Sequence, residues 1–172
     1  MRKLILVIVA LSLSSLGCNG HTGATKTTVV KKTEGKNSQR VVALEFAAEG
    51  IKKTDASSLE SSFCHELFNA PGVELLCPGD LAGIVEFKEL QVMTGECDDG
   101  SCLSKIAEKT NAHKIITGKI SKVGKMFMVS VNIADGESGD ITTRIQQQVD
   151  SEKLEDLLPA MKEVAQKVKK EL

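Results

Sequence analysis

Residues 41–48 read VVALEFAA, an almost unbroken apolar run that ends shortly before Gly50. A strand that is apolar on both faces has to be covered on both faces, which is typical of sheets flanked by helices. The chain has enough apolar residues for such a layered fold, since 41% of its 172 residues are hydrophobic. The run therefore predicts a covered strand in a domain that contains both helices and strands.

The next segments alternate between helical and strand patterns. Asp55 is expected to cap a helix over residues 56–69, and residues 73–77 form a second strand. Asp80 is expected to cap a second helix, which extends through Leu90. Strand, helix and strand joined by short links predict a right-handed βαβ unit with parallel strands.

The second half of the domain changes its periodicity. A third helix is expected over residues 101–111, followed by strands over residues 115–123, 127–133 and 141–149. Apolar and polar residues alternate in these strands, which predicts an antiparallel meander. A closing helix begins near residue 154.

Pro159 marks either a kink in the closing helix or the start of its main part. The complete order is β-α-β-α-α-β-β-β-α. The sequence thus predicts a single α/β domain with a mixed sheet over residues 40–172.

The amino terminus has the pattern of an export signal. Arg2 and Lys3 precede an apolar run over residues 4–13. A run of about ten residues is too short for the roughly 20 that span a bilayer, and it has the length usual in a signal peptide. Residues 1–17 are therefore expected to be a signal peptide.

Small residues precede Cys18, and this pattern resembles the lipobox of bacterial lipoproteins. The resemblance implies cleavage before Cys18 and anchoring in membrane lipid through the acylated cysteine. Asn19 in place of Asp implies the periplasmic leaflet of the outer membrane, because Asp at that position marks inner-membrane retention in lipoprotein families. An ordinary secretory signal cut near Gly17 is the alternative, since Ser15 stands where the lipobox prefers Leu.

Residues 18–39 are expected to form a flexible linker that carries the lipid. They are polar and rich in Thr, Gly and Lys, and they keep neither the strand nor the helix period. The formal net charge of −1 and the absence of Trp and Tyr give no electrostatic or stacking surface for nucleic acid.

Residues 40–150 resemble the small α/β domain shared by the amino-terminal region of TolB, the CsgG group of curli-secretion proteins and the penicillin-binding-protein activator lipoproteins. The resemblance rests on RVVALEFAAEG, on the segment that begins CDDGSCLSKIAEKTNAHKIITGKIS, and on the order of the elements. It implies a non-catalytic envelope module that binds another envelope protein or its own copies. The pore-forming hairpins of CsgG and the propeller of TolB have no counterpart in this sequence.

Four cysteines remain beside Cys18, and an even number in an exported chain favours disulfides. Cys97 and Cys102 lie in one tight loop and are the favoured pair. Whether Cys64 and Cys77 are also bonded is left open, because a helix and a sheet about 10 Å apart allow the bond without requiring it.

A small-molecule-binding or metal-binding periplasmic domain is the second hypothesis. Zinc held by Cys64, Cys97, Cys102 and His65 is disfavoured, because structural zinc sites usually have two cysteine knuckles and this chain has one. The acidic loop residues lack the spacing of a calcium loop, and a solvated turn is favoured for them; they are Glu96, Asp98 and Asp99.

No catalytic residues are expected. The string over residues 118–125 has one residue more than a P-loop, and Met126 stands where Ser or Thr must bind magnesium. The three histidines have no spacing that joins a nucleophile to a base; they are His21, His65 and His113.

Overall fold

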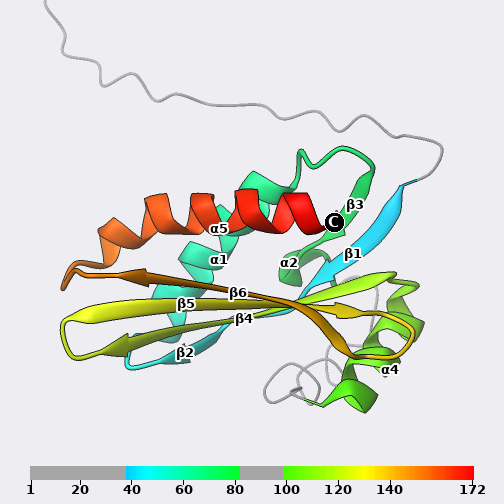
Figure 1. The fold of residues 1–172 in the computed structure, drawn as a ribbon, viewed down its shortest axis with the longest axis horizontal. Coiled ribbons are helices and arrows are strands. Elements are labelled where there is room, and N and C mark those ends of the chain that lie inside the picture. The colour runs from blue at the N-terminus through cyan, green and yellow to red at the C-terminus, as the bar shows by residue number, and fades with distance from the viewer. Residues whose placement is uncertain (1–37, 82–98) are drawn as a thin grey trace, which may run out of the picture.

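The computed structural model describes residues 38–81 and 99–172 (Figure 1). Within these ranges the elements are β1 (Gln39–Ala43), β2 (Ala47–Glu49), α1 (Lys53–Leu67), β3 (Val73–Leu76), α2 (Pro78–Leu81), α4 (Gly100–Thr110), β4 (Lys114–Val123), β5 (Met126–Asp135), β6 (Ile141–Val149), a 3-10 turn (Leu154–Asp156) and α5 (Leu157–Glu171). This is the predicted single α/β domain.

The strands form one six-stranded mixed sheet. Strands β3, β1, β4, β5 and β6 lie side by side in this order, and β2 pairs with β4. Strand β1 runs parallel to β3 and to β4, whereas β4, β5 and β6 are antiparallel neighbours. The predicted parallel βαβ unit and the predicted meander are both confirmed, and they meet at β4.

Helices cover the two faces of the sheet unequally. Helices α1 and α5 lie together across one face, and α4 lies against one end of the other face (Figure 1). The larger core includes Phe63, Leu67, Phe127, Met161 and Val164, and the smaller core below α4 includes Val42, Leu103, Ile106 and Ile115. Among the described residues no helix has the length and hydropathy to cross a bilayer.

The predicted strand over residues 41–48 is in fact two strands. Both β1 and β2 pair with β4. Between the two paired stretches, three residues of the chain (44–46) lie opposite two residues of β4 (117–118). One extra residue on one side of a strand pair interrupts the ladder and bends the strand. The apolar run could not reveal this interruption, because it continues unchanged through the break.

Phe46 turns into the larger core at this break. Its ring lies where a side chain on Gly118 would be, since a Cβ there would approach a ring carbon to 2.4 Å. The ring also packs against Phe63 of α1, with 5.2 Å between the ring centroids. The backbone N–H of Phe46 donates to Oε2 of Glu60 at 2.6 Å, so α1 is held directly to the interrupted strand.

Two predicted helix caps were wrong. The backbone N–H of Asp55 donates to the oxygen of Lys52 at 3.0 Å, so α1 has already begun and Asp55 lies in its first turn. Asp80 lies inside α2, where its Oδ2 accepts the backbone N–H of Cys77 at 2.9 Å. An acidic side chain that reaches back in this way closes the helix start from within. The rest of this predicted helix lies outside the described residues.

Pro159 falls in the first turn of α5, which begins at Leu157. The first N–H groups of a helix have no partner within it, so the missing N–H of proline costs nothing there. Of the two alternatives for Pro159, the structure confirms that it marks the start of the main part of the closing helix and not a kink.

Glu60 is a buried carboxylic acid in the larger core, with 5% of its surface exposed. Burial raises its pKa from 4.5 to about 6, against the opposing effect of the Phe46 N–H. The folded domain therefore binds this proton more tightly than the unfolded chain does. The resulting stability is complete below about pH 4.5 and is lost as the pH rises through about 6.

Replacing Glu60 by Gln should stabilise the domain at neutral pH, because the amide keeps an acceptor for Phe46 and removes the buried charge. We expect the free energy of unfolding at pH 7.5 to rise by about 1–2 kcal/mol, with a smaller dependence on pH between 4.5 and 6.5. Denaturant unfolding at several pH values measures both effects. The exposed Glu163→Gln variant is the control, and an equal pH dependence in Glu60→Gln and the parent would contradict the assignment.

Candidate functional site

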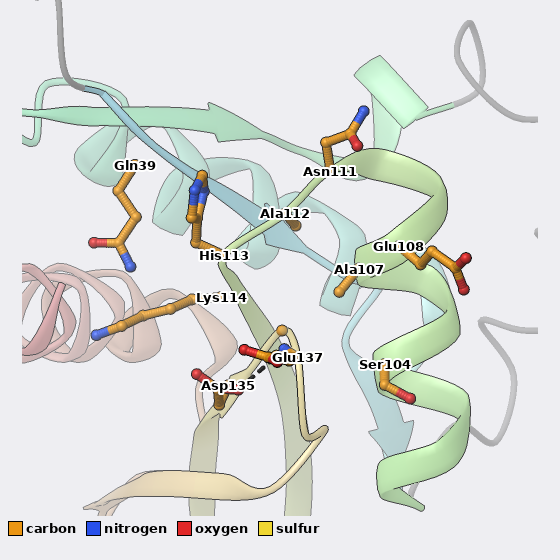
Figure 2. A pocket seen from close by; sticks show the side chains of 11 residues that line it. Gln39, Ser104, Ala107, Glu108, Asn111, Ala112, His113, Lys114, Asp135 and Glu137 are labelled. Carbon is orange, nitrogen blue, oxygen red and sulfur yellow. Dashed lines mark hydrogen bonds between the residues drawn. The ribbon is translucent and has the colours of Figure 1, made fainter.

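A polar groove of about 600 Å³ lies at the end of the sheet where β1 begins (Figure 2). Strand β1, the end of α4, the link into β4 and the turn between β5 and β6 form its walls. Its polar side chains include Gln39, Glu108, Asn111, His113, Lys114 and Glu137. None of the sequence motifs predicts this groove.

His113 holds the link into β4 against β1. The backbone N–H of Arg40 donates to Nδ1 of His113 at 3.1 Å, and the backbone N–H of His113 donates to the oxygen of Arg40 at 2.8 Å. An Nδ1 that accepts a hydrogen bond carries no proton, so the neutral ring has its proton on Nε2. The histidine has a structural role at the groove wall.

Asp135 organises the turn between β5 and β6. Its Oδ1 accepts the backbone N–H groups of Glu137 and Ser138, each at 3.0 Å, and Figure 2 marks the first of these bonds. The bond from Ser138 is the main cause that lowers the pKa of this carboxyl. Asp135 is therefore ionised and committed to the turn, which does not suit it to act as a general base.

The turn packs so closely on its neighbours that two glycines are required. A Cβ on Gly136 would approach the backbone oxygen of Ala112 to 2.3 Å. Gly139 has a φ of +75°, and a Cβ on it would approach the backbone oxygen of Gly100 to 1.9 Å. Contact with the start of α4 at this turn thus shapes one wall of the groove.

Two more polar side chains that line the groove are hydrogen-bonded to backbone oxygens. Lys114 donates from Nζ to the backbone oxygen of Glu171 at 2.6 Å, and Ser104 donates to the oxygen of Ser101 at 3.2 Å. Neither Ser104 nor Lys114 is hydrogen-bonded to His113. The ranges 38–81 and 99–172 also contain no group of three or more residues arranged to hold a metal ion.

Cys64 and Cys77 form a disulfide, with 6.4 Å between their Cα atoms. The bond joins α1 to the residue that follows β3, across a sequence separation of 13. Because the bond uses the Cys64 sulfur, Cys64 is unavailable to the zinc set that included His65. His65 is exposed on α1.

The other predicted site residues fall mostly outside the described ranges; these are Cys18, His21, Glu96, Cys97 and Asp98. Asp99 is described and caps α4, because its Oδ1 accepts the backbone N–H of Cys102 at 2.8 Å and the hydroxyl of Ser101 at 2.7 Å. These bonds, led by the one from Ser101, lower its pKa. Cys102 is disulfide-bonded, and its pairing with Cys97 stays a prediction.

The sheet also offers an edge that sequence reasoning did not locate. Strand β6 is the outermost strand on the meander side, with β5 as its partner. Its nine residues alternate between half-buried and exposed positions. Beside it, the face beyond α4 carries half-buried polar and apolar side chains of β5: Met128, Ser130 and Asn132.

The geometry defines a class of fold: one mixed α/β domain with a βαβ unit and a meander joined at β4. The sequence matches no protein-family model and no curated protein sequence.

Several solved structures share this fold. The C-terminal domain of LpoB from Salmonella enterica matches with a TM-score of 0.51 and 12% identity, over 67% of this chain and 84% of that chain. Lipoprotein GNA1162 from Neisseria meningitidis matches with a TM-score of 0.51 and 14% identity, over 76% of this chain and 97% of that chain.

The dodecamer-forming PelC from Paraburkholderia phytofirmans also matches, with a TM-score of 0.51 and 13% identity, over 74% of this chain and 85% of that chain. At such identities the likeness is one of fold. The expected likeness to a lipoprotein domain is confirmed at that level.

The packing of the turn predicts unequal effects of two glycine substitutions. Gly139→Ala should lower the free energy of unfolding by about 2–4 kcal/mol, because the strained φ and the clash with Gly100 both oppose it. Gly124→Ala is the matched control, since its φ is +62° but no atom lies within 4 Å of the added Cβ, and it should cost about 1 kcal/mol. Denaturant unfolding compares the two, and equal losses would refute close packing of the turn.

Proposed function

We propose that the protein is a lipid-anchored, non-catalytic module of the bacterial cell envelope that binds other proteins. The observation that carries this proposal is a fold shared with lipoprotein GNA1162, on a chain whose amino terminus resembles a lipoprotein signal. The chemistry of the groove agrees with it, since Asp135 holds the turn after β5 and His113 holds the link into β4 against β1.

Attachment is proposed to pass through Cys18, after removal of residues 1–17. A single acyl chain holds a protein only marginally, and the several chains of a mature bacterial lipoprotein hold it firmly. The linker over residues 18–39 would then join the lipid to the domain at β1. Asn19 supports a position on the periplasmic leaflet of the outer membrane.

Protein binding is proposed to use the sheet and not the helices. An exposed edge strand presents a row of backbone N–H and C=O groups, and an extended partner can add to it as a further strand. Strand β6 supplies such an edge, and its exposed side chains Arg144, Gln146 and Gln148 extend the polar face beyond α4. The partner would be another envelope protein or a second copy of the chain.

The groove supports a second candidate function, the binding of a small polar ligand. Its volume of about 600 Å³ lies in the range of small-molecule sites. Its lining is an even mixture of polar and apolar surface, whereas the pockets that usually hold such ligands are mostly apolar, which favours the first candidate.

Replacing Cys18 by Ala should release the protein from membranes, because the acylated sulfur is lost. We expect the variant in the soluble fraction after a salt wash, provided that its mass shows a cleaved signal peptide. Asn19→Asp is the control that keeps the cysteine, and it should remain membrane-bound and move to the inner membrane. A cleaved Cys18→Ala variant that stays in the membrane would contradict the lipid anchor.

Site-specific photo-crosslinking in intact envelopes tests protein binding. A photoreactive residue in place of Gln148, at the sheet edge, should give a discrete protein adduct, whereas one in place of Gln166 on the outer side of α5 should give little. Placement at Glu108 probes the groove. If none of these positions forms a protein adduct, the binding module is the wrong function, and ligand binding in the groove gains support.

A further inference from the structure

The strands at the two ends of the order β3-β1-β4-β5-β6 differ in how well they are protected. The edge at β3 has four residues, with Pro71 and Pro78 on either side and the charged Glu74 within it. Short edges, prolines and charges are the features that keep an edge from pairing with another chain. Strand β6 has nine residues, contains neither proline nor lysine, and carries Arg144 as its sole charge.

Apolar side chains of β6 are left partly exposed at this edge. Ile145 and Val149 pack against the larger core but are only half-buried. Ile141 packs against the smaller core and is also only half-buried. A neighbouring strand would complete their burial. Within residues 38–81 and 99–172, no strand pairs with the outer side of β6, and its apolar side chains there are incompletely covered.

The sequence of β6 has the same pattern in both directions. It reads ITTRIQQQV, with apolar residues at its two ends and at its centre and three polar residues in each interval. A register shift lies beside Ile141, so the regular pairing with β5 covers residues 143–149. A strand that is equivalent in the two directions is suited to pair antiparallel with a copy of itself, as a two-fold interface requires.

We propose that β6 pairs antiparallel with β6 of a second copy, with Ile145 of each chain on the two-fold axis. This inference rests on the proposed protein-binding function and names its partner. Ile145 then faces its own counterpart on the side of α5, and Thr143 faces Gln147 of the second copy. The two sheets join into one that continues across the dimer.

The charge on β6 selects this register. With Ile145 on the axis, Arg144 stands opposite Gln146 of the second copy, whose amide oxygen can accept from the guanidinium. With Arg144 on the axis, two like charges would face each other, which opposes pairing. An axis at Ile145 also places residues 143–147 of the two copies opposite one another, all within the regular part of the strand.

Single cysteines in the full chain test the register in intact cells. Directly opposed residues of an antiparallel pair have Cα atoms about 4.5–5.5 Å apart, which suits a disulfide. Ile145→Cys alone should therefore give a disulfide-linked dimer on non-reducing electrophoresis. Thr143→Cys and Gln147→Cys should each give none alone and a dimer when the two variants are expressed together.

Charge substitutions at Gln146 test the same interface without a crosslink or a core change. Gln146→Lys places a cation opposite Arg144 of the second copy at two equivalent positions, so we expect the association constant to fall about two- to thirtyfold. Gln146→Glu should raise it by a similar factor. Gln166→Lys on α5 is the matched control and should leave association unchanged. Sedimentation of the detergent-solubilised full chain measures all four proteins.

The outcomes separate this inference from the proposed function. A dimer from Thr143→Cys alone as strong as that from Ile145→Cys would overturn the register, and so would equal association of the Lys and Glu variants at position 146. An Ile145→Cys adduct with a different protein would overturn self-pairing and support protein binding. If Ile145→Cys forms no adduct while photoreactive residues elsewhere on the domain do, the role of the β6 edge is overturned and the protein-binding function stands.

Discussion

Strand β4 hydrogen-bonds to β1 and β2 on one side and to β5 on the other, and the rest of the domain depends on this strand. Parallel pairing requires the chain to cross over a face of the sheet: α1 makes this crossing between β2 and β3, and α4 precedes β4, which lies parallel to β1. Antiparallel pairing on the second side needs only tight turns, so β5 and β6 follow without a helix between them. The sheet is mixed because these two modes of pairing meet at one strand.

At the interruption between β1 and β2, the side chain of Phe46 packs between helix α1 and strand β4. Gly118 leaves space for Phe46, and Phe46 in turn contacts Phe63 and the carboxylate of Glu60. Burying Glu60 costs stability at neutral pH, and the hydrogen bond from Phe46 offsets part of that cost. The disulfide between Cys64 and Cys77 ties the other end of α1 to the parallel pair.

The described helices cover the sheet unequally. Helices α1 and α5 share one face, and α4 reaches one end of the other, so the side chains of β5 on that second face are only half-buried. Among the described strands, β6 is outermost beside β5. The groove arises where the turn after β5 packs on the start of α4 and the end of α4 returns into β4.

Local patterns in the sequence determined the elements of this protein, because the spacing of apolar residues depends only on whether a segment is helical or extended. The alternation over residues 115–149 predicts the meander in this way, whereas the run at 41–48 indicates extended chain without its break, and Pro159 leaves a kink and a helix start equally open. The caps at Asp55 and Asp80 were misjudged, since a polar residue in a first turn has the same local signature as one just before it. Only the tertiary structure decided that the first strand breaks over Gly118, that Cys64 meets Cys77, and that β6 is the outermost described strand beside β5. These features depend on which distant segments become neighbours, and no local period carries that information.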